Sequence, residues 1–142
     1  MKRASWLLAL VLLAAAPAAK VKVKDAWMRE PNPGRPIGAA FMTLENPGSR
    51  AIALVGVTSD AAKRIELHEM SMKDGMMSMR QVERIAIPAK GTVRLAPGGF
   101  HLMLFDLTRA IHGGDVVQLT LRFDDGSTVR VATPVRVPEG AQ

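Results

Sequence analysis

The sequence contains no cysteine and no tyrosine, and only two tryptophans and four phenylalanines stand among its 142 residues. Without cysteine we expect neither a disulfide nor a cysteine-linked lipid, and the thiolate ligand of a blue-copper electron-transfer site is missing. The fold must therefore be held together by its hydrophobic core alone. Soft-metal chemistry, where present, is left to histidine and methionine.

Positive charge and aromatic side chains are too sparse to predict nucleic-acid binding. The formal net charge is +6, and setting aside Lys2 and Arg3 leaves 17 basic and 13 acidic residues, with the basic ones scattered singly. Enzymatic motifs are also missing, because no Gly-x-Ser-x-Gly elbow and no Ser-His-Asp grouping is visible. His112 precedes Gly113-Gly114 and is interpreted as a surface turn residue. We therefore expect a binding protein and not an enzyme.

The first nineteen residues have the composition of a secretory signal. Lys2 and Arg3 are followed by an apolar run over residues 6–15 and by small residues at Ala16-Pro17-Ala18. This run is too short for a membrane span. The sequence predicts a signal peptide over residues 1–19 and a single β-domain over residues 20–142, located in the periplasm or another extracytoplasmic space. An uncleaved anchor is the open alternative.

The remainder of the chain alternates short β-like runs with turn residues, and it shows no convincing amphipathic helix. Residues 59–64 are the one candidate for a helical turn. Residues 117–123 alternate apolar and polar side chains, and Asp125-Gly126 is a strong hairpin signal before the next run. This pattern predicts an all-β sandwich or small barrel. The expected strands cover residues 21–28, 39–44, 52–57, 65–70, 77–87, 92–95, 101–105, 116–123 and 127–135.

Six of the nine methionines and two of the three histidines lie between His68 and Met103. Each of these histidines is followed two residues later by a methionine, as His68-Glu69-Met70 and as His101-Leu102-Met103. In a strand, residues two apart point to the same face. Each histidine is therefore expected to share a face with its methionine.

A two-residue turn at Asp74-Gly75 would pair Met70 with Met79 and place both on the face of His68. His68 and Met79 then become diagonal neighbours, about 7–8 Å apart at the backbone, within joint reach of one ion. A three-residue loop would instead move Met79 to the opposite face. This local geometry permits either Met70 or Met79 as a ligand.

Imidazole and thioether are the ligands that the soft ion Cu(I) favours, whereas Zn²⁺ more often takes histidine with cysteine or carboxylate. The alternative interpretation is that the methionines fill a core and the histidines are ordinary surface residues. It is weakened by the polar side chains of Arg64 and Glu66 beside His68. The sequence thus predicts a copper(I) site and leaves core packing open.

At these residues the sequence resembles the PCu(A)C family of periplasmic copper chaperones. The motif of that family is a histidine, ten residues, a methionine, twenty-one residues and then His-x-Met. His68, Met79, His101 and Met103 match all of these spacings. The resemblance continues over nearly the whole mature chain, including residues 25–29, 38–44, 97–104, 114–115 and 123–127.

The resemblance implies a cupredoxin-like Greek-key β-sandwich or barrel with a solvent-accessible Cu(I) site at those four residues. It also implies copper supply to the copper centre of a terminal cytochrome c oxidase, directly or with a Sco-type thiol protein, so that a membrane is reached only through the partner. Some relatives carry a His- and Met-rich C-terminal tail. Residues 137–142 lack one, so a copper(II) site is not expected there.

Three alternatives stay open beside this function. Periplasmic copper storage or resistance would use the same site, and a metal-linked dimer is compatible with it. Met70, Met72, Met76 and Met77 exceed the four-ligand motif. They form a second site or an entry path, or they line the hairpin, and lining is the favoured interpretation.

Overall fold

The computed structural model describes residues 21–139, so the segment predicted as a signal peptide lies outside the described residues. These residues form ten strands and no helix, which confirms the all-β class, and none of them provides a helix of the length and hydrophobicity that a membrane span requires. The strands are β1 (Lys22–Arg29), β2 (Ile37–Glu45), β3 (Ile52–Thr58), β4 (Ala62–Lys73), β5 (Met76–Val82), β6 (Ile85–Ile87), β7 (Thr92–Leu95), β8 (Phe100–Leu107), β9 (Val116–Phe123) and β10 (Thr128–Arg136).

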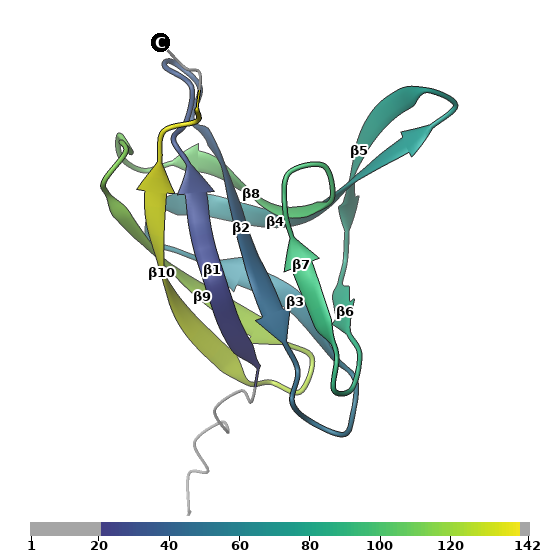
Figure 1. Ribbon diagram of the computed structural model, residues 1–142. Helices are drawn as coiled ribbons and strands as arrows, with labels where there is room; N and C mark the ends of the chain where they lie inside the picture. The colour runs from purple at the N-terminus through teal and green to yellow at the C-terminus, as the bar shows by residue number, and fades with distance from the viewer. Residues whose placement is uncertain (1–20, 140–142) are drawn as a thin grey trace, which may run out of the picture.

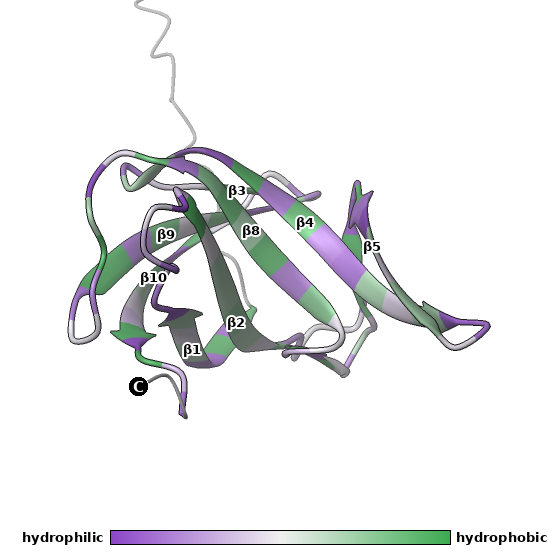
Figure 2. Cartoon of the chain, turned by 90° about the horizontal axis from the view of Figure 1, so that it is seen from above, coloured by the Kyte–Doolittle hydropathy of each residue, from purple (hydrophilic) through white to green (hydrophobic). Residues whose placement is uncertain are grey.

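The strands follow one hydrogen-bonded path in the order β5-β4-β8-β2-β1-β10-β9-β3-β6, and β7 pairs with the end of β2. All pairs are antiparallel except β1 with β10, which is parallel. In Figure 1 the path folds over on itself, with β1, β2 and β10 in front and β3 and β9 behind them. β4 and β8 run side by side as an antiparallel pair, and the β4–β5 hairpin extends away from the body (Figures 1 and 2).

The core lies between the two layers and is built from alternate residues of the strands. β9 shows this alternation most clearly, because Val117, Leu119, Leu121 and Phe123 are buried while the residues between them face outward. The chain has no disulfide, so the burial of these apolar side chains supplies the main stabilising free energy of the fold. The fully buried side chains from other strands include Met28, Met42, Leu44, Leu54, Ile85, Ile87, Leu95, Leu102 and Leu104.

The hairpin between β9 and β10 forms where Asp125-Gly126 predicts it. Gly126 has a positive φ of 84°, and the Ser127 backbone N–H donates a hydrogen bond of 2.8 Å to the Asp125 carboxylate. The Ser127 hydroxyl donates to the same carboxylate oxygen. These hydrogen bonds hold the pKa of the Asp125 carboxyl below its usual value, because they stabilise the charged carboxylate. The bond from the Ser127 hydroxyl has the larger effect, and the bond from the backbone N–H comes second.

Two details differ from the expected strands. Residues 77–87 do not form one strand, because the chain leaves the β4 edge after Val82 and joins β3 as β6. The reason is burial: Ile85 and Ile87 enter the core, whereas residues 76–81 are exposed. Residues 59–64 form no helical turn, since a bridge joins Ser59 to Ala62 and β4 begins at Ala62.

Candidate metal site

The β4–β5 hairpin has the register that the turn residues predict. Asp74 and Gly75 both have positive φ, 53° and 76°, as a two-residue hairpin turn of type I′ requires. Met70 is therefore paired with Met79, and His68 with Gln81. The alternative of a three-residue loop, which would move Met79 to the other face, is excluded.

β8 runs on the other side of β4 and places His101 directly opposite His68. The two imidazole rings lie with their centroids 5.7 Å apart and their planes tilted by 41°. This direct pairing joins segments separated by more than thirty residues, and no local turn in the sequence predicts it. It brings the two halves of the His-x-Met pattern together on one face.

The two methionines of the predicted site flank this histidine pair. Met103 is paired with Glu66, two residues before His68, so Met103 is the diagonal neighbour of His68 on β8. Met79 is the diagonal neighbour of His68 on β5. Diagonal neighbours lie about 7–8 Å apart, within reach of long side chains. All four predicted residues thus lie on one face, with His68 at its centre.

Hydrogen bonds orient both imidazole rings. His101 Nδ1 lies 3.0 Å from the carbonyl oxygen of Gly99, and His68 Nε2 lies 2.8 Å from a carboxylate oxygen of Glu66. A carbonyl and a carboxylate oxygen can only accept, so these nitrogens carry the protons in the neutral rings. The remaining nitrogens, Nε2 of His101 and Nδ1 of His68, keep their lone pairs for a ligand.

The Nδ1 atom of His68 is the observation that most directly indicates a ligand at this face. It is buried and has no hydrogen-bond partner among the described residues. Leaving a buried polar atom unpaired costs roughly 1–3 kcal/mol, and such an atom in a native fold calls for an explanation. A metal ion on the lone pair of Nδ1 would supply the missing partner.

Glu66 contacts the predicted site directly, whereas the sequence indicated it only as a polar neighbour of His68. Its side chain bonds His68 and also lies 3.3 Å from the Arg64 guanidinium, which in turn stacks 4.6 Å from the ring centre of Phe105. A carboxylate that holds a ligating histidine fixes the ring and raises its basicity. Its position two residues before His68, on the same strand face, is the signal that could have found it.

Aromatic side chains enclose the other flank of the histidine pair. The ring of Phe41 on β2 lies 6.4 Å from that of His101 and 4.7 Å from that of Trp27 on β1. The Arg29 guanidinium stands 5.7 Å from the centre of the Phe41 ring. This wall leaves His101 only 4% exposed. The site is therefore anchored on the β8 side and open toward the hairpin, where Met79 is 47% exposed.

The four predicted ligands would offer two imidazole nitrogens and two thioether sulfurs. Within residues 21–139 no three His, Asp or Glu side chains are grouped so as to hold a metal by themselves. The thioethers of Met79 and Met103 are further donors on this face. Hard cations such as Mg²⁺ and Ca²⁺ prefer oxygen ligands. Soft Cu(I) fits this set of donors best.

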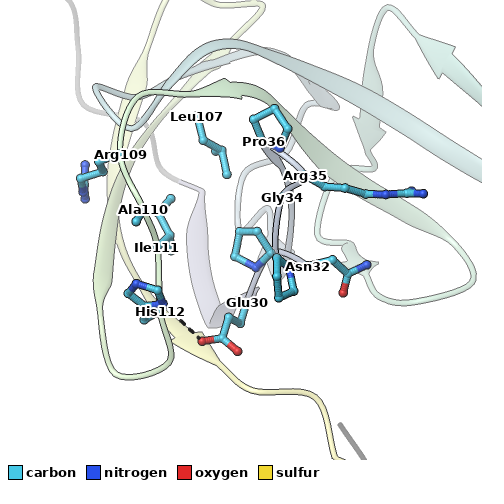
Figure 3. A pocket seen from close by; sticks show the side chains of 12 residues that line it. Glu30, Asn32, Gly34, Arg35, Pro36, Leu107, Arg109, Ala110, Ile111 and His112 are labelled. Carbon is cyan, nitrogen blue, oxygen red and sulfur yellow. Dashed lines mark ion pairs between the residues drawn. The ribbon is translucent and has the colours of Figure 1, made fainter.

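A separate pocket of about 580 Å³ lies between the β1–β2 loop and the segment after β8, and none of the predicted ligands lines it. Figure 3 shows His112 at its rim beside Glu30, and their side chains approach to 3.9 Å. His112 is exposed, and its backbone N–H donates to Asp115, as expected for a turn residue. Arg35 and Arg109 point away from the cavity in Figure 3.

The family described as "Putative lipoprotein LpqE-like" has a profile that matches residues 21–135, which is most of the chain. The chain belongs to this family. A protein named "Putative lipoprotein Lxx21020", from Leifsonia xyli subsp. xyli, is similar to this LpqE-like chain, with 42% identity over 122 residues covering 85% of this chain and 72% of the relative. An uncharacterized protein of Rickettsia prowazekii is 32% identical over 90 residues, covering 63% of this chain and 50% of its own length.

Solved structures place this LpqE-like chain among the PCuAC domains. The apo DR1885 protein from Deinococcus radiodurans is 32% identical with a TM-score of 0.66, covering all of this chain and 95% of that one. Its CuI form gives a TM-score of 0.65 at 32% identity, covering 92% and 84%. The copper-bound PCuAC domain from PmoF2 gives a TM-score of 0.73 at 25% identity, covering 86% and 97%. These matches confirm the PCu(A)C resemblance and the cupredoxin-like β-fold.

Proposed function

We propose that this protein binds one Cu(I) ion through His68, Met79, His101 and Met103 and acts as an exported copper chaperone. The observation that carries the proposal is the direct pairing of His68 with His101, in which the Nδ1 atom of His68 is buried without a hydrogen-bond partner. Met79 and Met103 are the diagonal neighbours of His68 on the two adjacent strands. The CuI and copper-bound forms of similar domains support the choice of metal. The description of the family as a lipoprotein supports an extracytoplasmic location.

We further propose that the copper goes to the copper centre of cytochrome c oxidase, directly or with a Sco-type thiol protein. Delivery requires that the ion leave without a large barrier. Thioether sulfur is neutral and carries no proton, so an incoming ligand can replace it without a proton transfer. His101 and Met103 stand on the strand anchored at the sheet interior, whereas Met79 stands on the exposed hairpin. Exchange is therefore expected to begin at Met79 and to end at His101.

A deletion strain distinguishes delivery from copper storage or resistance. If the protein delivers copper, deletion lowers cytochrome c oxidase activity at ordinary copper levels, and added copper restores it, because a high supply bypasses the chaperone. Oxidase activity and growth in copper are the two measurements. Normal oxidase activity together with copper sensitivity would contradict delivery and favour the storage or resistance function. Complementation with the intact gene is the control.

The carboxylate of Glu66 offers a test that leaves all four ligands in place. Glu66→Gln keeps the shape of the side chain but removes the charge that faces the His68 Nε2–H, so the ring is held less firmly and its lone pair is less basic. Loss of such an outer partner costs about 10- to 100-fold in metal affinity, and we expect about 10-fold for this conservative change. Competition with a chromogenic Cu(I) chelator measures the change.

Glu69→Gln is the matched control for this experiment. Glu69 lies one residue beyond His68, on the opposite face of β4, where it pairs with Arg80 at 2.9 Å. The Glu69→Gln substitution removes the same charge from the same strand without changing a contact of His68. Equal affinities of the Glu66 and Glu69 variants would contradict a positioning role of Glu66.

A further inference from the structure

The tip of the β4–β5 hairpin carries methionines that the four-ligand site does not use. Met72 is directly paired with Met77, one step beyond the pair of Met70 and Met79. Met72 is 69% exposed and Met77 is 61% exposed, and every residue from 71 to 81 is exposed. These side chains therefore fill no core. Exposed large apolar side chains grouped together mark a site of interaction more often than packing.

The two faces of this hairpin differ in chemistry. On one face the hydroxyls of Ser71 and Ser78 lie 3.2 Å apart, and Glu69 forms its ion pair with Arg80. The other face carries only thioethers beyond His68, from the pair Met70–Met79 to the tip pair. Figure 2 shows the hairpin reaching away from the body of the sandwich, with hydrophilic and hydrophobic residues alternating along β4. The sulfur-bearing face is thus continuous with the copper site.

We propose that Met72 and Met77 form a second, weaker Cu(I) site at the hairpin tip, through which the ion passes on its way to and from the four-ligand site. Directly paired residues have Cβ atoms about 4.5–5.5 Å apart, so two flexible thioethers there can hold one soft ion between them. Successive pairs on this face stand about 7 Å apart along the strands, with Met70 and Met79 between the tip and His68.

The tip site is weak for reasons that the structure supplies. It offers two thioethers and no imidazole, and both side chains are open to water. A low affinity suits a transfer position, because an ion held too tightly at the tip would not move on. The role in transfer rests on the proposed function, whereas binding at the tip is a property of these two residues alone.

The test is a Cu(I) titration of the whole protein under anaerobic conditions, observed through the methionine methyl signals in NMR. In the wild type the first equivalent should shift the methyls of Met79 and Met103, and the second should shift those of Met72 and Met77. The double variant Met72→Leu/Met77→Leu should bind the first equivalent unchanged and lose the second. Leucine nearly conserves the volume of methionine, and the exposed tip tolerates it.

Met76→Leu is the matched control. Met76 is 74% exposed at the same tip but is paired with Lys73, on the face opposite to Met72 and Met77. This variant should keep the second equivalent.

A wild type that shows no shift at Met72 and Met77, or a double variant that keeps the second equivalent, would overturn the tip site. Shifts at Met72 and Met77 with none at Met79 and Met103 would instead support the tip site and contradict the four-ligand site. The two failures are therefore distinguishable.

Discussion

Replacement of His101 by alanine is expected to lower the affinity for Cu(I) by about a hundredfold or more, since even changes outside the ligand shell cost about 10- to 100-fold. His101 is nearly buried, its ring is held by the Gly99 carbonyl, and it faces His68 directly. It is therefore the most buried of the four proposed ligands. Competition with a chromogenic Cu(I) chelator gives the affinity, and a hundredfold loss corresponds to about 2.8 kcal/mol.

Two further variants separate loss of a ligand from loss of the fold. Met103→Leu removes a thioether with little change in volume, so a fall in affinity there cannot be attributed to a collapsed site. His112→Ala removes an exposed histidine that lies outside the metal face and should leave the affinity unchanged. Affinities of the His101 and Met103 variants equal to that of the wild type would rule out the four-ligand assignment.

Local signals were sufficient for most of the strands and for both hairpins. The alternation of residues 117–123 gives β9 because a half-buried strand has a period of two. Asp74-Gly75 gives the β4–β5 register because both residues adopt positive φ there. The separation of β5 from β6 was missed because residues 77–87 contain no turn signal and were predicted as one β-like run. Which part enters the core depends on partners in β3 that are far away in the sequence.

The site was predictable in composition but not in arrangement. The His-x-Met spacing places each histidine on a face with its methionine, yet only the pairing of β4 with β8 decides that His68 meets His101 and not a residue one step away. That register is set by the burial of Leu67 against Leu102 beneath the site, and nothing in the turn sequences encodes it. The hydrogen bond from His68 to Glu66 follows from the same strand face and could have been anticipated.

The arrangement is consistent with the proposed binding and release of one ion. Burial and hydrogen bonds fix the histidines, and Met103 stands on the same anchored strand as His101. The opposite side of the site is the β4–β5 hairpin, in which residues 71–81 are all exposed. Segments with little buried apolar surface open at low free-energy cost. In the proposed function the buried side would set the affinity, and the exposed hairpin would give an incoming ligand its access.

Leu102→Ala is expected to be the most destabilising single change near the site. Leu102 is fully buried, it lies between His101 and Met103 in β8, and it points to the core while they point to the metal face. Truncating a buried leucine costs about 2–5 kcal/mol in the free energy of unfolding. A domain of this size has about 5–15 kcal/mol in total and no disulfide to make up the loss. Urea denaturation measures the effect as a lower midpoint with an unchanged slope.

The matched control is Val116→Ala on β9, where the side chain is exposed and the expected change lies within about 0.5 kcal/mol. A loss below about 1 kcal/mol for the Leu102 variant would mean that the core beneath β8 can close over the gap, contrary to its tight packing. Because the four proposed ligands lie on the face opposite to Leu102, the molecules that remain folded should keep their Cu(I) affinity. Added Cu(I) should then raise the unfolding midpoint of this variant, since a ligand that binds only the folded state stabilises it.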